Sequence, residues 1–403
     1  MSGIYIHIPF CKQACHYCNF HFSTSLRYKN ELIAALLKEI EIYSSSSNPG
    51  LRPDVIGTPS PKEKENGNNY LFAEKRKTTP DIIETIYFGG GTPSLCTKDE
   101  IASIIEKIKS AFKISRDVEI TLEANPDDII EEKLKDWKDA GINRLSIGVQ
   151  SFFEEDLQWM NRAHNAKQAV DSLQLAVDSF DNITIDLIYG TPELTNEKWK
   201  QNVEKAISLN IAHLSCYALT VEPKTPLDKL IRQHKSEDIN PDKQSEQFLL
   251  LMQWLEEAGY EHYEISNFAK PGFRSRHNSS YWQGKKYLGI GPSAHSFDGN
   301  TRWWNIANNN TYLDSINKGI IPFEKEELTA TQKLNETIMI SLRTVEGLDL
   351  SKVNEATSFE LQAMSRKYIE SGLVKLENNF LRLTREGKLL ADGIAADLFF
   401  TDQ

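Results

Sequence analysis

The sequence predicts an α/β fold in which a partial (β/α)6 barrel is followed by a small winged-helix-like α+β domain. Up to about residue 270, short β-branched runs alternate with longer segments of helical periodicity, which is typical of strand–helix units around a parallel sheet. After about residue 322 the pattern changes to helices and one short hairpin. A hydrophobic content of 40% and a charged content of 26% are ordinary for a globular chain of 403 residues.

Six strand–helix units are expected in the first part of the chain. The strands are predicted at 4–10, 85–91, 118–124, 144–150, 183–190 and 213–220, and the helices at 30–43, 99–112, 131–140, 166–180, 196–209 and 244–258. A seventh strand is predicted at 263–269, where the sequence reads YEISNFA. The stretch 44–80 is polar and rich in Pro, Gly and Ser, so we expect a flexible surface insertion there.

The last part of the chain predicts a separate small domain. Helices are expected at 331–343, 350–355 and 358–371, and Asn378 and Asn379 can supply the positive φ angles of a tight hairpin between two short strands. We therefore expect a core at 1–235, a barrel extension at 236–322 and a winged-helix-like domain at 323–403. The last domain has mixed charge and no basic stripe, which favours packing or partner docking over DNA binding.

Charge and hydropathy limit the classes of partner. A formal net charge of -11 argues against binding to nucleic acid, whose affinity comes mainly from Lys and Arg. No window is apolar enough for a transmembrane span, although peripheral association with a membrane stays compatible with the sequence. The segment MSGIYIHIPF resembles neither a signal nor a transit peptide, so a cytoplasmic location is expected.

Three of the five cysteines, Cys11, Cys15 and Cys18, lie within eight residues in a CxxxCxxC pattern directly after the first strand. A loop with three thiolates can hold a [4Fe-4S] cluster and leave one iron open, whereas structural zinc needs a fourth ligand. Zinc with His16 or His21 as that ligand stays open as the alternative. The isolated Cys96 and Cys216 are expected to be small buried apolar residues.

Polar residues at the ends of later strands predict a ligand pocket. The glycine run GGGTPS at 89–94 follows the second strand, and glycines allow a ligand to approach the backbone closely. Glu123, Gln150 and Asp186 end or nearly end three further strands, and ligands of parallel α/β proteins lie beyond the carboxyl ends of strands. The alternatives are a tight turn for the glycines and hydrogen bonds to neighbouring loops for the other three.

The cysteine loop resembles that of the radical S-adenosylmethionine (SAM) superfamily, CxxxCx-aromatic-C, with Tyr17 as the aromatic residue. This resemblance implies that residues 1–235 are a radical SAM core. It implies that SAM chelates the open iron through its amino and carboxylate groups, and that an electron from the cluster splits the sulfonium to give a 5'-deoxyadenosyl radical. The glycine run matches the segment that holds the amino group of SAM in that superfamily.

Six segments extend the resemblance to one family: YIHIPFC, YFGGGTPS, EANPD, RLSIGVQSF, IDLIYGTP and YLGIGPSAHS. They are similar to the oxygen-independent coproporphyrinogen oxidases and the related haem chaperones. The resemblance implies the following cofactor-binding residues: Tyr5, Tyr17, Gly90, Gly91, Thr92, Glu123, Gln150, Arg162 and Asp186.

Three features favour the chaperones over the oxidases. The oxidases carry a fourth cysteine two residues after the third, where this chain has Phe20, and they have a longer segment before the cysteine loop. The third feature is HNxxYW at His277, Tyr281 and Trp282, which resembles the haem-binding motif of the chaperones. An imidazole can ligate haem iron, and two aromatic rings offer apolar faces to a porphyrin. His295 and His7 are the other candidate ligands.

Basic residues around this motif could pair with haem propionates, namely Lys270, Arg274, Arg276, Lys285 and Lys286. The alternative is a loop whose aromatic residues plug the base of the barrel.

The expected function is that of a haem chaperone with three cofactors: a [4Fe-4S] cluster, SAM and haem. Its expected partners are haem, acceptor haem proteins such as respiratory ones, and an electron donor. One alternative is an oxygen-independent coproporphyrinogen III oxidase, which decarboxylates its substrate oxidatively to protoporphyrinogen IX. Another is a radical SAM enzyme that acts on an unrelated substrate.

Overall fold

The structure is a computed structural model that describes residues 3–45 and 82–401. Nearly all of the segment 44–80, where the sequence predicts a flexible insertion, therefore lies outside the described residues. Its first two residues form the end of helix α1 (Lys29–Ser45).

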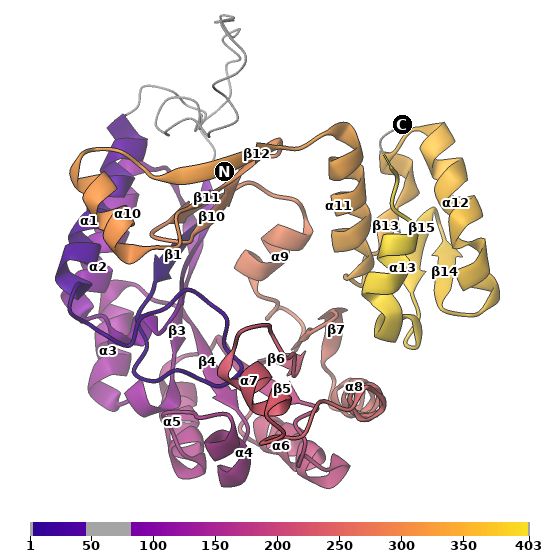
Figure 1. The fold of residues 1–403 in the computed structure, drawn as a ribbon, viewed down its shortest axis with the longest axis horizontal. Coiled ribbons are helices and arrows are strands. Elements are labelled where there is room, and N and C mark those ends of the chain that lie inside the picture. The colour runs from indigo at the N-terminus through magenta and orange to yellow at the C-terminus, as the bar shows by residue number, and fades with distance from the viewer. Residues whose placement is uncertain (1–2, 46–81, 402–403) are drawn as a thin grey trace, which may run out of the picture.

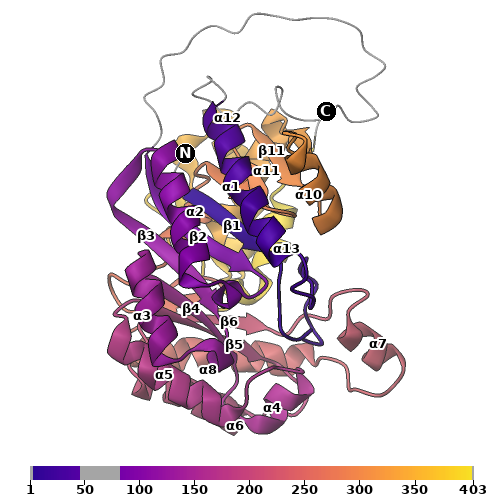
Figure 2. The ribbon, with the colours of Figure 1, turned by 90° about the vertical axis from the view of Figure 1, so that its left-hand side faces the viewer.

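Six parallel strands form the wall of a partial barrel, which confirms the predicted (β/α)6 fold (Figure 1). The strands are β1 (Gly3–Ile8), β2 (Ile83–Gly90), β3 (Ile114–Ala124), β4 (Arg144–Gln150), β5 (Ile183–Tyr189) and β6 (His213–Ala218). Besides α1, the helices that follow them are α2 (Lys98–Ala111), α3 (Glu131–Ala140), α5 (Ala166–Ser179), α6 (Asn196–Ser208) and α8 (Pro241–Glu257). Figure 2 shows these helices along the outer face of the wall. Because neighbouring strands run parallel, their carboxyl ends meet at one mouth of the barrel.

Two further short helices lie in loops at this mouth. Helix α4 (Glu154–Trp159) follows β4, and α7 (Pro226–Arg232) follows β6. Figure 2 shows α7 projecting from the body of the barrel.

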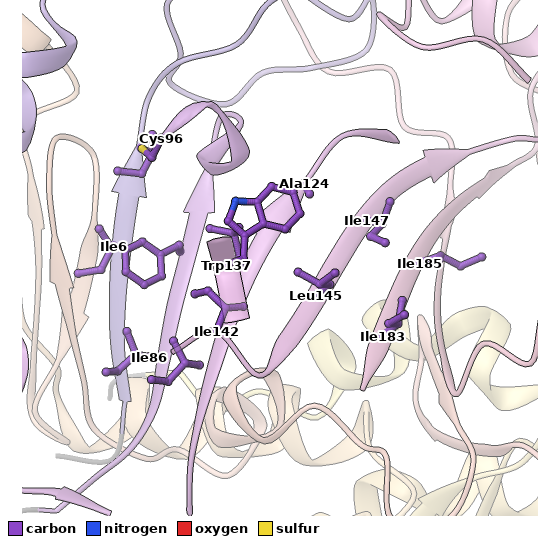
Figure 3. Packing of buried hydrophobic residues seen from close by; sticks show 14 of the residues in the cluster. Ile6, Ile86, Cys96, Ala124, Trp137, Ile142, Leu145, Ile147, Ile183 and Ile185 are labelled. Atoms are coloured by element: carbon purple, nitrogen blue, oxygen red, sulfur yellow. The ribbon is translucent and has the colours of Figure 1, made fainter. Parts of the chain in front are cut away.

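The alternation of side chains along β1 explains the two faces of the wall. Ile4, Ile6 and Ile8 are fully buried against the outer helices, whereas Tyr5 and His7 point to the barrel interior. The other strands contribute isoleucines and leucines to the same core, and Trp137 of α3 packs among them (Figure 3). Each fully buried aliphatic side chain contributes about 1.5–3 kcal/mol to folding. The core therefore lies between wall and helices, and leaves the interior for polar residues.

The sheet continues at both edges of the barrel in the order β12-β11-β10-β9-β1-β2-β3-β4-β5-β6-β8-β7. The added strands are β7 (Glu261–Glu264), β8 (Asn267–Ala269), β9 (Tyr287–Ile290), β10 (His295–Phe297), β11 (Thr301–Asn305) and β12 (Phe323–Glu327). Two helices accompany them, α9 (Arg276–Trp282) and α10 (Asn309–Asn317). Strand β9 runs parallel to β1, and β10 to β12 continue antiparallel.

The prediction of a single seventh strand at 263–269 is wrong. Ile265 and Ser266 form a turn, and the segments on either side pair with each other as the antiparallel strands β7 and β8. The alternating pattern continues through this turn, so it could not reveal the reversal of direction.

The C-terminal part is the small α+β domain that the sequence predicts. It comprises α11 (Ala330–Leu342), β13 (Leu348–Asp349), α12 (Glu355–Glu370), β14 (Val374–Glu377), β15 (Phe380–Leu383) and α13 (Ala391–Asp397). The predicted hairpin turn is confirmed, since Asn378 and Asn379 have φ angles of 50° and 66°. The predicted helix at 350–355 is only a 3₁₀ turn, and β13 and α13 were not predicted. Around Ile338, Leu361 and Leu381 the domain has a hydrophobic core of its own.

Strand β12 pairs with β11, so the main sheet extends to Glu327. This strand lies just after the expected domain boundary at 322/323, among residues that were expected to belong to the C-terminal domain. The division into domains at 1–235, 236–322 and 323–403 stays a proposal. In the described parts of the chain, every helix is too short or too polar to cross a bilayer.

Candidate functional site

The cysteine loop connects β1 to α1 at the mouth of the barrel. The backbone N–H of Cys11 donates to Ser23 O at 3.0 Å, and the N–H of His16 donates to Met160 O at 3.1 Å. From the other side, the N–H of Leu227 in α7 donates to His16 O at 2.8 Å. One bond within the loop and two separate segments, at Met160 and at Leu227, therefore hold the loop that carries Cys11, Cys15 and Cys18.

All three thiols line one cavity of about 510 Å³, within the size range of small-molecule sites. Burial raises the pKa of Cys11 to about 11 and also raises that of Cys18. A guanidinium N–H of Arg162 donates to Sγ of Cys15 at 3.2 Å. Because thiolates are costly in this half-buried position, a bound metal that supplies positive charge would complete the site.

The donor set fits a multi-iron cluster better than a single zinc ion. His16 Nδ1 bonds to Trp159 O at 2.8 Å, and His21 Nε2 bonds to Asn309 Oδ1 at 2.8 Å, so one ring nitrogen of each imidazole is already used by another partner. Within residues 3–45 and 82–401, no three His, Cys, Asp or Glu side chains converge as ligands of one ion. In a [4Fe-4S] cluster the irons lie at different corners, so each of the three thiolates binds its own iron and the three need not converge on one ion.

The glycine run beneath the loop is tightly packed. Gly90 has φ +106°, and a Cβ there would lie 2.5 Å from the ring of His7, while one on Gly91 would lie 2.5 Å from Phe10 O. The N–H of Gly91 donates to Ile8 O and the N–H of Thr92 to Phe10 O, at 2.9 and 2.6 Å. These N–H groups hold the cysteine loop, so the run can offer a ligand mainly carbonyl oxygens, which suit a donor such as an ammonium group.

Two half-buried carboxyl groups form the inner wall of the cavity. Glu123 accepts from Tyr87 Oη at 2.8 Å and from Gly90 N at 3.1 Å. Burial raises the pKa of Glu123 to about 7 and that of Asp186 to about 6, and each side chain lines the same cavity. Carboxyl groups with raised pKa values are complementary to a cationic ligand, which would stabilise their charged forms.

Gln150 and Arg162 complete this wall. Gln150 is buried at φ 70° beside a register shift in β4, a conformation that costs a non-glycine residue about 1–2 kcal/mol. Besides Cys15, Arg162 donates to Asn125 Oδ1 at 2.9 Å and to Gly148 O at 2.8 Å. Asn125 also donates to Thr92 Oγ1 at 3.3 Å, so it links the glycine run to Arg162. The sequence analysis missed Asn125, although it lies in the EANPD segment two residues after Glu123.

The two tyrosines of the predicted site lie differently. Tyr17 lines the cavity, and Arg162 approaches its hydroxyl at 3.4 Å. Tyr5 is not among the lining residues. It lies deeper in the barrel, where its hydroxyl bonds to His7 Nδ1 at 3.2 Å and its ring stacks on Tyr87 at 6.1 Å. The structure therefore brings the predicted residues together at the mouth, with Tyr5 one layer below.

The HNxxYW motif forms α9, away from this cavity, and it packs against β2 and α11 (Figure 1). His277 is 1% exposed, and its two ring nitrogens bond to Thr85 Oγ1 and Tyr281 Oη, both at 2.8 Å. Its ring stacks on Tyr87 at 4.8 Å. Trp282 lies under the guanidinium of Arg343 at 5.2 Å. In this arrangement the motif closes the floor of the barrel, by which we mean the end opposite the mouth.

Most of the basic residues around α9 are engaged by partners distant in sequence. Arg274 pairs with Glu261 and Glu346, at 2.5 and 2.7 Å, and Arg276 pairs with Asp117 at 3.3 Å. Lys285 pairs with Glu84 at 3.1 Å, and Lys270 donates to Asn210 Oδ1 at 2.5 Å. The local excess of positive charge that the sequence indicates is therefore largely neutralised.

Comparisons with known proteins agree with this fold. The model of the radical SAM superfamily matches residues 5–206, and the model of the HemN C-terminal domain matches residues 328–390. The chain is 32% identical over 402 residues to "Heme chaperone HemW" of Bacillus subtilis, and the match covers 98% of both chains. It is 33% identical over 434 residues to "Radical S-adenosyl methionine domain-containing protein 1, mitochondrial" of Dictyostelium discoideum, covering 97% of this chain and 93% of that relative.

A solved structure shares the fold over almost the whole chain. The coproporphyrinogen III oxidase HemN of Escherichia coli matches with a TM-score of 0.78 at 22% identity, over 98% of this chain and 89% of that one. At this identity the match shows the architecture alone. Taken with the full-length relatives, it shows that the protein belongs to the radical SAM superfamily and, within it, to the family of the HemW-type haem chaperones.

Proposed function

We propose that the protein is a haem chaperone that binds haem, carries a SAM-coordinated [4Fe-4S] cluster, and delivers the haem to acceptor haem proteins. Relatives named for this role, at about 30% identity over nearly the full length, support the proposal. The oxidase alternative has support from shared fold alone.

Membership of the radical SAM superfamily implies a [4Fe-4S] cluster and SAM. Cys11, Cys15 and Cys18 would hold the cluster, and the cavity beside them would hold SAM. When bound, this pair supplies an electron from the cluster to the sulfonium of SAM. The chain's own part is to orient the ligand through the glycine carbonyls, to balance its positive charge with Glu123 and Asp186, and to fix the cysteine loop through Arg162.

The full-length relatives named for the chaperone role carry the choice between chaperone and oxidase, and the charge of the cavity supports SAM as its ligand. Among the described residues that line it, Arg162 is the one cationic side chain. Its two terminal nitrogens donate to Cys15, Asn125 and Gly148, while its buried Nε–H has no partner. The carboxylates Glu123, Asp186 and Glu222 face the same space. This charge suits the cationic groups of SAM, which a chaperone and an oxidase of this superfamily would both bind.

The role of His277 as the haem ligand stays a prediction. Burial lowers its pKa to about 3, with a smaller contribution from Arg144, so the imidazole is neutral as ligation requires. An iron could reach a ring nitrogen of His277 only if the bond to Thr85 or to Tyr281 were broken. Because the ring is also 1% exposed, haem ligation there would require the side chains around α9 to rearrange.

We further propose a cytoplasmic location, an electron donor that reduces the cluster, and respiratory haem proteins as acceptors.

The proposal is tested by two parallel measurements on anaerobically reconstituted protein. In the first, haemin is titrated and the Soret band followed. In the second, coproporphyrinogen III is incubated with SAM and a reductant, and the porphyrin products are separated by chromatography. We expect a saturable Soret change with one haem per chain and no protoporphyrinogen IX above the uncatalysed level. Catalytic formation of protoporphyrinogen IX would replace the chaperone with the oxidase.

A further inference from the structure

The nine histidines of the chain differ in how their ring nitrogens are used. Seven donate or accept a hydrogen bond within the described residues, namely His7, His16, His21, His164, His213, His262 and His277. Only His234 and His295 make no such bond in the described parts of the chain. Both are exposed, so an iron could reach either imidazole without displacing a hydrogen-bond partner. His164 and His213 also keep one unbonded ring nitrogen each, but both are buried.

The surroundings of these two histidines differ. His234 follows α7 on a projecting loop and stacks on no aromatic ring of the described chain. His295 begins β10, and its ring stacks on Trp304 of β11 with a centroid distance of 5.9 Å and an interplanar angle of 27°. An axial ligand beside a large aromatic face is what a porphyrin requires, because the iron takes the nitrogen and the macrocycle needs apolar contact.

The register of the sheet places further apolar surface on the same face. His295 lies opposite Trp304, and Phe297 lies opposite both Arg302 and Tyr287. Directly paired residues share a face of the sheet, and so do residues two apart along a strand. The rings of Tyr287 and Phe297 are 6.2 Å apart. We call these four aromatic residues, with Arg302, the β9–β11 face.

This face continues the inner wall of the barrel toward the cysteine loop. Strand β9 runs beside β1, and the residue opposite Tyr5 is Gly289, two positions after Tyr287. Burial lowers the pKa of His7 to about 4, and the nearby His21 and His295 lower it further. His21 lies three residues after Cys18, so His295 lies on the side of the barrel that carries the cluster loop, unlike α9 on the floor.

Charge on the face also fits a haem. Arg302 lies over the ring of Phe297 at 5.7 Å and pairs with Glu326 and Glu336. A propionate could exchange with one of these carboxylates at little cost, because the pair with Glu326 is at the surface. Partial burial, together with Arg302, lowers the pKa of His295, which keeps its imidazole neutral and its lone pair available.

We propose that haem binds on the β9–β11 face, with His295 as its axial ligand and Trp304 against the porphyrin. This site rests on the proposed haem-binding function and gives that function a location. His277 then serves as a structural residue of the floor, and the side chains around α9 need not rearrange for haem to bind.

The test is a titration of the full-length, anaerobically reconstituted protein with haemin, followed by Soret absorption and resonance Raman spectra. The variants are His295→Ala, the matched exposed control His234→Ala, and His277→Gln. We expect His295→Ala to lose the histidine-ligated signature and to weaken binding by about tenfold or more. His234→Ala and His277→Gln should keep the wild-type spectrum, and added imidazole should restore the ligated band in His295→Ala.

Two further outcomes separate the site from the function. If wild-type protein shows no saturable haem binding, the proposed function itself fails. If it binds haem, but His295→Ala matches it in spectrum and affinity, or His277→Gln alone loses the ligated band, the β9–β11 site is wrong and the chaperone function stands. Trp304→Leu gives an independent check, since it should weaken affinity while the axial-ligand signature stays unchanged.

Discussion

The two ends of the barrel carry polar residues on the same strands. They differ in how many of the polar atoms already have a hydrogen-bond partner within the protein. At the floor, His277 is bonded at both ring nitrogens and stacked on Tyr87. At the mouth, three half-buried thiols and two half-buried carboxyl groups face a cavity. Thiolates and carboxylates without counter-charges are costly to bury, so the mouth is built for a ligand and the floor for stability.

The cysteines of the mouth give the largest expected effect. Cys11→Ala, Cys15→Ala or Cys18→Ala should each abolish the cluster, because a three-thiolate site has no spare ligand. Wild-type protein reconstituted under anaerobic conditions should contain about four irons and four sulfides per chain, measured by colorimetric assays and by absorption near 400 nm.

Cys96→Ala and Cys216→Ala are the matched controls, since both residues are buried, at 4% and 1% exposure, away from the loop. Both variants should keep the full iron content. If either lost its iron while a loop variant kept it, the mouth would no longer be the cluster site.

The floor should respond in stability rather than in cofactor content. His277→Ala removes a fully buried ring and leaves the hydroxyls of Thr85 and Tyr281 without their partner. The combined cost of a cavity and lost hydrogen bonds should be about 2–4 kcal/mol in the free energy of unfolding, measured by urea denaturation.

The exposed His295 provides the control for this experiment. His295→Ala should change stability by less than about 0.5 kcal/mol, as is usual for surface substitutions. Iron content and SAM affinity should stay unchanged in His277→Ala. Equal stabilities of the two variants would show that the floor is not the structural element that its contacts indicate.

The sequence predicted the parts of the molecule that depend on local pattern. The alternation of Ile4, Ile6 and Ile8 with polar residues identified β1, and the pair Asn378 and Asn379 identified the hairpin turn. The cysteine spacing and the polar residues at strand ends correctly placed one pocket at one mouth, because parallel strands bring their carboxyl ends together whatever the length of the connections.

Features set by pairing between distant segments could not be predicted in the same way. The positive residues near α9 were expected to meet propionates, but Glu84, Asp117 and Glu346 lie beside them only in the folded chain. For the same reason the sequence could not show that His277 meets Thr85, nearly two hundred residues away. It also gave no signal for Asn125, whose role depends on where Arg162 lies.

The smallest expected effect concerns the charge of the mouth, and it depends on pH. Burial raises the pKa of Glu123 to about 7, so this carboxyl is largely protonated below that pH and ionised above it. A cationic ligand binds the ionised form, and its affinity should therefore fall as pH decreases through 7. Asp186, with a pKa raised to about 6, adds to the decrease at lower pH.

Other groups that face Glu123 do not titrate in this range. Tyr5, Tyr87 and Tyr281 stay neutral because burial raises their pKa values well above neutrality. Equilibrium dialysis with labelled SAM should show roughly tenfold weaker binding at pH 6 than at pH 8. In Glu123→Gln the profile should be flatter. The amino group of SAM titrates equally with both proteins, so the difference between the two profiles reports Glu123. Parallel profiles would mean that Glu123 does not contact the charged part of the ligand, and the mouth would then owe its affinity to Asp186 and the glycine carbonyls.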